Sequence, residues 1–449
     1  MVNPVILVGG VLFALITYAV LYIRIYNKKK LELIDWFTIS LATFNGLGFS
    51  FVFWATNNGT NSSFWNQYIS MYDNQTAVMY LLSSIILGLS SAFGWKVFKS
   101  LKPSKFINEK NMSGAYTIRI IKKLKLVAWI MLILGVFSYA LYANAYGGFL
   151  GLLNYSIAIR SGVMSINNPF SFLQRFGSFA FFSSFIFFGL IIDKTIDKKH
   201  IKRCFWGFIL SLSFSIYVLY SWAGRVGALI YLATFMLGYL LHNYKTVTKL
   251  IRKLIILGVS LPLVLLGIDS LLSRSSSSIG ITELFAKELS FPLASYVVQF
   301  GQDNYRFFKD IVVAPLFLLP QRIWSVMLNI EVASSYNTFV FFGARKGEAG
   351  VTGSIPVDML TFANMQASIF GVVVVGLLWG ALIYYLEIFV RKINPIGVRK
   401  VIYSNMILNI ALLTVLYGDP QHIVIRNFAM IIGLILMTVV TKFKLGFQR

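Results

Sequence analysis

Three polar side chains near the C-terminus are of the types that acid–base chemistry uses. Asp419, His422 and Arg426 lie in the segment Tyr417–Phe428, between two apolar runs. A carboxylate or an imidazole can take a proton from an acceptor hydroxyl group, and a guanidinium can stabilise a leaving anion. The segment therefore predicts a catalytic turn built on Asp419 and His422. A structural role stays open as well, because Asp-Pro is a common turn signal.

Arginines near the ends of apolar runs predict a site for an anion. Arg225 follows Ala-Gly in a hairpin so tight that it is held at the membrane edge, and Arg160, Arg322, Arg345 and Arg426 also stand near run ends. A guanidinium binds phosphate or carboxylate through two parallel hydrogen bonds. We expect Arg225 to act in catalysis and the other four to bind substrate. Contact with lipid headgroups is the alternative for each, and for the other four an ion pair within a loop is a further alternative.

The segment Gly343–Asp358 is rich in glycine and contains Arg345, so its backbone N–H groups could also face an anion. A mobile surface loop is the alternative. Tyr305, Trp324 and Tyr336 are candidate platforms for sugar rings, with Tyr336 assigned to substrate binding.

The sequence predicts no metal ion and no cofactor. The three histidines are scattered, no HExxH motif occurs, and a single cysteine, Cys204, excludes an internal disulfide and an all-cysteine metal site.

The composition predicts a polytopic membrane protein. Of 449 residues, 57% are hydrophobic and 12% charged, and the mean hydropathy is +0.73. Such a chain needs lipid as solvent. The net charge of +24 is expected to follow from basic cytosolic loops and not from nucleic-acid binding.

Eleven apolar runs are long enough to span a bilayer. They lie at 4–23, 32–54, 77–95, 126–146, 173–192, 204–222, 225–243, 254–272, 367–390, 401–417 and 424–441. We therefore expect an all-α fold with a transmembrane block at 1–270, a long loop at 271–366 and a second transmembrane block at 367–449. Within the loop, Ile281–Phe300 is expected to be an amphipathic surface helix and Ile311–Pro320 a re-entrant or interfacial piece.

The distribution of basic residues predicts the orientation. If the N-terminus is outside, 29 of the 40 Lys and Arg residues fall on cytosolic segments, against four in the short outer loops. The positive-inside rule thus places the N-terminus and the 271–366 loop outside and the C-terminus in the cytoplasm.

Two stretches resemble a known family. The tight hairpin in Tyr220–Leu237, with its Gly224-Arg225 pair, and the run Gly353–Leu382, with Phe370-Gly371 and Trp379-Gly380, are similar to the oligosaccharide repeat unit polymerases, the Wzy or O-antigen polymerase family. Arg225 carries over directly as the hairpin arginine. The paired Arg-x10-Gly signature of some members is not found.

The resemblance implies a metal-independent glycosyltransferase of GT-C-like architecture in the bacterial plasma membrane. Its donor and acceptor would be oligosaccharides linked to undecaprenyl diphosphate, with membrane lipids, a chain-length regulator and a flippase as further partners. Arginines would stabilise the diphosphate leaving group.

Three alternatives remain. The protein could be a ligase that moves finished glycan from the lipid carrier, a flippase or other transporter, or a membrane scaffold without enzymatic activity. The long loop and the lack of two related halves weigh against a transporter.

Overall fold

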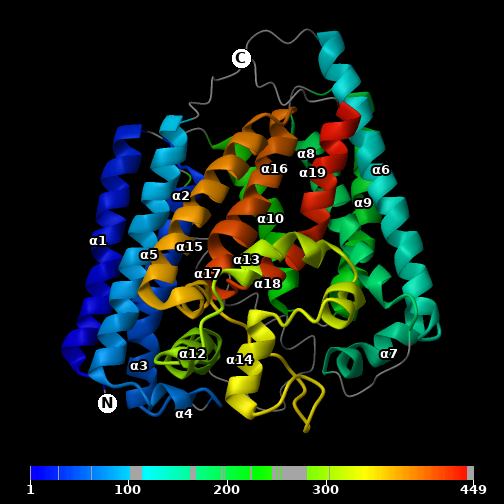
Figure 1. Cartoon of the computed structure of the whole chain (residues 1–449). Helices are drawn as coiled ribbons and strands as arrows, with labels where there is room; N and C mark the ends of the chain where they lie inside the picture. The colour runs from blue at the N-terminus through cyan, green and yellow to red at the C-terminus, as the bar shows by residue number, and fades with distance from the viewer. Residues whose placement is uncertain are drawn as a thin grey trace. The chain divides into compact units, whose positions relative to one another are not determined.

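The computed structural model describes residues 2–28, 30–61, 63–101, 114–161, 168–193, 196, 198–222, 225–244, 250, 253, 281–302 and 304–441. These residues fold almost entirely into helices, and no strand occurs among them (Figure 1). Contacts divide the chain into two compact units. Unit 1 comprises Met1–Ser104, Ser273–Glu387 and Asn409–Val424, and unit 2 comprises Lys105–Leu272, Ile388–Leu408 and Ile425–Arg449. Each unit thus draws on the N-terminal and the C-terminal parts of the chain.

Unit 1 contains long membrane helices and a set of short ones. Its elements are α1 (Pro4–Lys28), α2 (Leu33–Leu41), η1 (Ala42–Gly48), α3 (Phe49–Asn57), α4 (Asn66–Ile69), α5 (Asn74–Leu101), α12 (Ile281–Gln299), α13 (Lys309–Val312), η4 (Ala314–Leu318), η5 (Arg322–Met327), α14 (Ala333–Phe342), α15 (Met359–Arg391) and α17 (Leu413–Leu416). The helix α18 (Pro420–Arg426) begins in this unit.

Helices α5 and α15 approach each other closely through small residues. A Cβ atom added at Gly94 would meet the backbone of Leu377, and one at Gly376 or Gly380 would meet Ser90 or Ser91 on α5. Small residues let two membrane helices pack backbone to backbone, where dispersion forces replace the hydrophobic effect. Gly380 is one of the glycines on which the family resemblance is based. The close packing of α15 against α5 explains why a glycine is found at this position.

Helix α15 is broken inside the apolar run. Ala367 and Ser368 have non-helical backbone angles, and Ser368 has a positive φ of 51°. The carbonyl groups freed by the break accept hydrogen bonds from a loop: Arg306 N–H donates to Met365 O at 2.9 Å and Phe307 N–H to Gln366 O at 3.1 Å. Backbone groups at membrane depth need such partners. The predicted span 367–390 thus begins at the break, and the helix continues eight residues further toward the N-terminus, from Met359 to Gln366.

The helix expected at Ile281–Phe300 is present as α12, but the prediction that it is amphipathic is wrong for its second half. Every residue from Ser290 to Tyr296 is buried. Helices α3, α4 and α14 pack against it (Figure 1). A helix enclosed on all sides has no solvent face, so its polar residues must find internal partners. Ser295 does so, as an acceptor from Asn337 Nδ2 at 3.1 Å.

Unit 2 is a second helical bundle. Its elements are α6 (Gly114–Asn144), α7 (Gly148–Ser161), η3 (Ser171–Ser178), α8 (Phe179–Ile192), α9 (Lys198–Ser221), α10 (Arg225–Asn243), α16 (Ile396–Met406), η6 (Ile407–Leu412, which extends into unit 1) and α19 (Phe428–Thr441). Helix α8 packs against α6, α9 and α16. The buried carboxylate of Asp193 accepts a hydrogen bond from Gly397 N–H at 2.8 Å, which fixes the start of α16.

The predicted membrane spans agree with the helices. Nine helices in the described part of the chain are long and apolar enough to cross a membrane, and the bent pair Pro420–Arg426 and Phe428–Thr441 adds a tenth if it forms one span. The expected span at 254–272 lies outside the described residues. The segment Ile311–Pro320 forms the short helices α13 and η4 instead of a span. The described part of the chain is therefore all-helical with many candidate spans, as expected for a polytopic membrane protein.

Candidate functional site

Asp419 is a buried anchor between two short helices. Its side chain is 0% exposed. One carboxylate oxygen accepts a hydrogen bond from the backbone N–H of Ser334 at 2.8 Å, at the start of α14, and the other accepts from Gln421 N–H at 2.8 Å, at the start of α18. Both oxygens are used by backbone donors and lie away from solvent. This geometry suits a carboxylate that positions helices better than one that takes a proton from a substrate.

His422 stands one turn into α18 and is only partly buried. Its ring centroid lies 6.2 Å from that of Tyr417, which in turn lies 5.3 Å from Phe291 on α12. Val424, on the same short helix, packs on the core formed by Phe317 and Trp324. Part of the His422 side chain thus reaches solvent, while its Nδ1 atom is buried. Arg426 is the exposed last residue of α18.

Arg306 is a partly buried cation that the sequence prediction missed; its side chain is 12% exposed. Its guanidinium forms two hydrogen bonds to the Asp310 carboxylate, at 2.6 and 2.8 Å, and a third to the backbone carbonyl of Glu331 at 2.6 Å. Its charge also lies 5.7 Å from the ring centroid of Tyr336. The i, i+4 spacing of Arg306 and Asp310 was a signal visible in the sequence. With so many internal bonds, Arg306 holds the loop before α14 in place.

Arg345 is the exposed counterpart of Arg306. Its guanidinium lies 2.9 Å from the Glu331 carboxylate and 5.3 Å from the ring centroid of Phe339. The two charged side chains are 49% and 34% exposed. A pair that is open to water is weak. An incoming anion of higher charge can therefore compete with Glu331 for Arg345.

Tyr336 and Arg322 differ in how they are held. Tyr336 is partly buried, and its hydroxyl accepts a hydrogen bond from Asn304 Nδ2 at 3.3 Å. Arg322 is exposed on η5.

The prediction that Trp324 is an open sugar platform is wrong: its side chain is 2% exposed and packs edge-on against Phe317. Tyr305 is 38% exposed and stays accessible.

Asp358 is a second group that the sequence analysis did not single out. It precedes the first turn of α15, and Oδ2 accepts hydrogen bonds from the backbone N–H groups of Leu360 and Thr361 at 3.1 and 3.2 Å. The side chain is 0% exposed. Burial is the main cause that raises the pKa of this carboxyl group from 3.8 to about 7, against the opposing effect of the Thr361 hydroxyl and the helix N–H groups. Its place before a long apolar run is a helix N-cap signal that the sequence contained.

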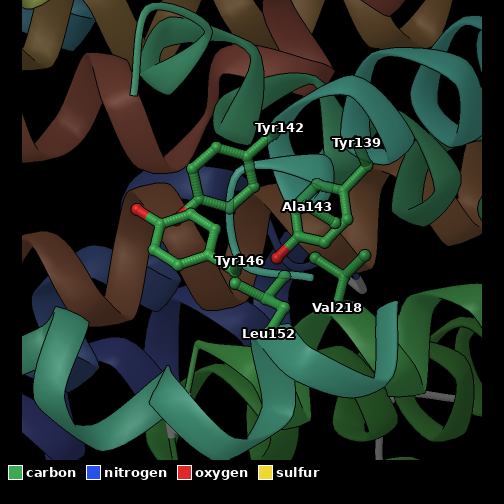
Figure 2. Packing of buried hydrophobic residues seen from close by; sticks show 6 residues of the cluster. All are labelled: Tyr139, Tyr142, Ala143, Tyr146, Leu152 and Val218. Carbon is green, nitrogen blue, oxygen red and sulfur yellow. The ribbon is translucent and has the colours of Figure 1, made fainter. Parts of the chain in front are cut away.

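A cluster of tyrosines lies in unit 2. Tyr139 and Tyr142 of α6 and Tyr146, in the turn after α6, are buried with Leu152 of α7 and Val218 of α9 (Figure 2). Tyr139 shares a hydrogen bond of 2.7 Å with Ser221. The cluster thereby ties α6, α7 and α9 together by aromatic packing.

Two residues on the rim of this cluster are neighbours of the arginines. Ile159 packs against it one position before Arg160, at the end of α7, and Trp222 packs against it shortly before Arg225, the first residue of α10. Arg160 and Arg225 thus follow residues that pack on the same aromatic core.

The predicted site residues fall into two sets. Tyr336, Arg345, Asp419 and His422 belong to unit 1, together with Arg322, whereas Arg160, Arg225 and Arg426 belong to unit 2. In the described part of the chain, no group of three His, Cys, Asp or Glu side chains is placed to hold a metal ion. No protein-family model matches the sequence, and comparisons with curated proteins and with solved structures gave no match.

Proposed function

We propose that the protein is a membrane glycosyltransferase of GT-C-like architecture that polymerises oligosaccharide repeat units linked to undecaprenyl diphosphate. The reaction would take place on the outer face of the bacterial plasma membrane, with the N-terminus outside and the C-terminus in the cytoplasm. A ligase for the finished glycan and a flippase for lipid-linked oligosaccharides are the competing functions.

One observation supports this proposal above the others. The segment from α12 to the loop after α14 carries exposed Arg345 and Tyr305 and partly buried Tyr336, in the same unit as the His422 turn. A cation, aromatic rings and a partly exposed imidazole in one unit suit a substrate that has both sugars and a diphosphate.

In the proposed reaction the acceptor hydroxyl attacks the sugar carbon that bears the donor diphosphate. His422 takes the hydroxyl proton, the bond between that carbon and the diphosphate oxygen breaks, and the diphosphate leaves as an anion. Arg345 stabilises this anion after exchanging its partner Glu331 for the phosphate, with Arg225 and Arg160 as further cations for the donor. Arg322 and Arg426 hold the remainder of the substrate. Asp419 positions α14 and α18 around His422.

The test is a gel of surface polysaccharide from cells that lack the gene, complemented at equal membrane expression. Wild type should restore a ladder of repeats, whereas Arg225→Ala and Arg345→Gln should leave single repeats on the carrier or anchor. Lys346→Gln removes a neighbouring charge on the same exposed loop and should restore the ladder. Long chains that stay on the carrier lipid would indicate a ligase, and repeats on the cytosolic leaflet would indicate a flippase; either result would refute the proposal.

A further inference from the structure

Among the described residues of unit 1, seven buried side-chain oxygens have no hydrogen-bond partner at proper geometry, and four of them belong to neighbouring side chains of α5, α12 and α15. These four are Ser83 Oγ on α5, Tyr296 Oη on α12, and Asp358 Oδ1 and Thr361 Oγ1 at the start of α15. Each side chain is almost completely enclosed. A buried polar atom left unsatisfied is costly, so four of them near one another need an explanation.

These oxygens belong to one neighbourhood. Ser83 is close enough to Tyr296 to lower the pKa of its phenol group, and Thr361 has the same effect on the pKa of Asp358. Asp358 in turn raises the pKa values of Tyr296 and of Tyr72. The neighbourhood is therefore one carboxyl group surrounded by hydroxyl groups.

The titratable groups that face Asp358 from the surrounding elements are phenols. Tyr80 lies on α5, Tyr296 on α12 and Tyr72 between α4 and α5, and the rings of Tyr80 and Tyr296 meet edge to face at 5.1 Å. Within the part of the chain that the structure describes, Asp358 forms no ion pair with a Lys, Arg or His side chain. A buried carboxylate without a cation is costly, and it becomes neutral instead.

The oxygen atoms of these four side chains suit a bound proton better than a bound metal ion. The four side chains supply one negative charge, and every other oxygen belongs to a hydroxyl group that carries its own proton. A protonated Oδ1 becomes a hydrogen-bond donor to a neighbouring hydroxyl oxygen, so one added proton satisfies the carboxyl group and one of its neighbours.

Asp358 also lies against the turn that leads to His422. Gly418 N–H donates a hydrogen bond to Val357 O at 2.8 Å, and a Cβ atom at Gly418 would collide with the backbone of Asp358 and Met359. Asp419 follows at once in the chain. A change in the charge of Asp358 is thus transmitted to this turn through backbone contact and not through solvent.

We propose that Asp358 is a proton-binding site in the interior of unit 1 and that its ionisation positions the turn Tyr417–Asp419. Because burial raises the pKa of Asp358 to about 7, the site gains and loses its proton near neutral pH. The inference goes beyond the proposed glycosyl transfer and does not depend on it.

The first test is infrared spectroscopy of the purified full-length protein. A carbonyl stretch of a protonated carboxylic acid should be present at low pH, disappear with a midpoint near pH 7, and be missing from Asp358→Asn. The titration should be the same in sodium and choline buffers. A band that Asp358→Asn retains unchanged would overturn the proposal, and so would a midpoint that sodium lowers at fixed ionic strength, since that result would indicate a cation site.

The second test reports on the turn. A nitroxide is attached to Gln421→Cys in a Cys204→Ser, His422→Gln background, which removes the buried native thiol and the imidazole next to the label. The spectrum should change between roughly pH 5 and pH 9, with a midpoint near 7, and Asp358→Asn should abolish the change. A label at Gln302→Cys, on an exposed loop of the same unit, serves as the control and should not respond. A pH response that persists in Asp358→Asn, or no response in the parent, would refute the coupling.

Discussion

Replacing Asp358 by Asn should stabilise the protein, and the gain should grow with pH. Asn has nearly the shape of a protonated Asp and is an equally good residue before the first turn of a helix, so the hydrogen bonds to Leu360 and Thr361 can be kept. The substitution removes the free-energy cost of ionising a carboxyl group that is 0% exposed.

The size of the effect follows from the pKa of Asp358 in the two states. The group has a pKa of 3.8 when unfolded and about 7 when folded, so the unfolded state loses its proton first as pH rises. Wild type therefore loses stability through the window from pH 3.8 to about 7 and is constant above it. About three pH units correspond to about 4 kcal/mol. The gain in Asp358→Asn should be about 2 kcal/mol at pH 5 and about 4 kcal/mol at pH 8.

The assay is thermal unfolding of wild type and variant in the same detergent across this range of pH. Asp73 supplies a control of opposite sign: it is exposed, it accepts a hydrogen bond from Thr76 N–H at 2.7 Å at the start of α5, and this bond lowers its pKa. Asp73→Asn should therefore destabilise at neutral pH and lose its effect in acid. If Asp358→Asn has a Tm no higher than wild type at pH 8, or a gain that does not change with pH, the reasoning about this carboxyl group is wrong.

Three further predictions follow from other contacts. Gly380→Ala forces α5 and α15 apart and should cost about 1–3 kcal/mol, measured by thermal unfolding, while Gly353→Ala enters open space and should be nearly neutral. Arg306→Gln leaves its buried carboxylate partner unpaired and should cost about 3–5 kcal/mol in the same assay, against no clear change for exposed Lys309→Gln. Arg345→Gln should shift Tm very little, since its ion pair is worth about 0–1 kcal/mol, yet lower polymer formation at least about tenfold; a large fall in Tm with normal polymer would contradict its assigned role.

Hydropathy alone predicted most of the candidate membrane-spanning helices, because a span must be apolar over its whole length whatever it packs against. The predicted start of a span at 367 coincides with the non-helical Ala367 and Ser368, but the helical residues before the break, from Met359, were not predicted. Hydropathy could not show that α12 is enclosed on all sides, because enclosure depends on α3, α4 and α14, which are remote in sequence.

The candidate site was less accessible to sequence reasoning. Residue type alone made Asp419 a candidate base and Trp324 a candidate sugar platform. In the structure, both carboxylate oxygens of Asp419 accept hydrogen bonds from backbone N–H groups, and Trp324 is packed in a hydrophobic core. Asp358 was overlooked for the converse reason. An isolated acid in a glycine-rich segment carries no sign of burial, and burial is the main cause that raises its pKa.

The break in α15 sets a requirement on the order in which the chain is made. Met365 and Gln366 leave their carbonyl groups open, and the N–H groups of Arg306 and Phe307 close them. Those donors come from a segment that leaves the ribosome some sixty residues before the acceptors do. Synthesis in the N-to-C direction therefore supplies the donors before the acceptors. A circular permutation that placed 304–308 after α15 would keep every contact of the finished fold and still leave both carbonyl groups without partners until those residues are made.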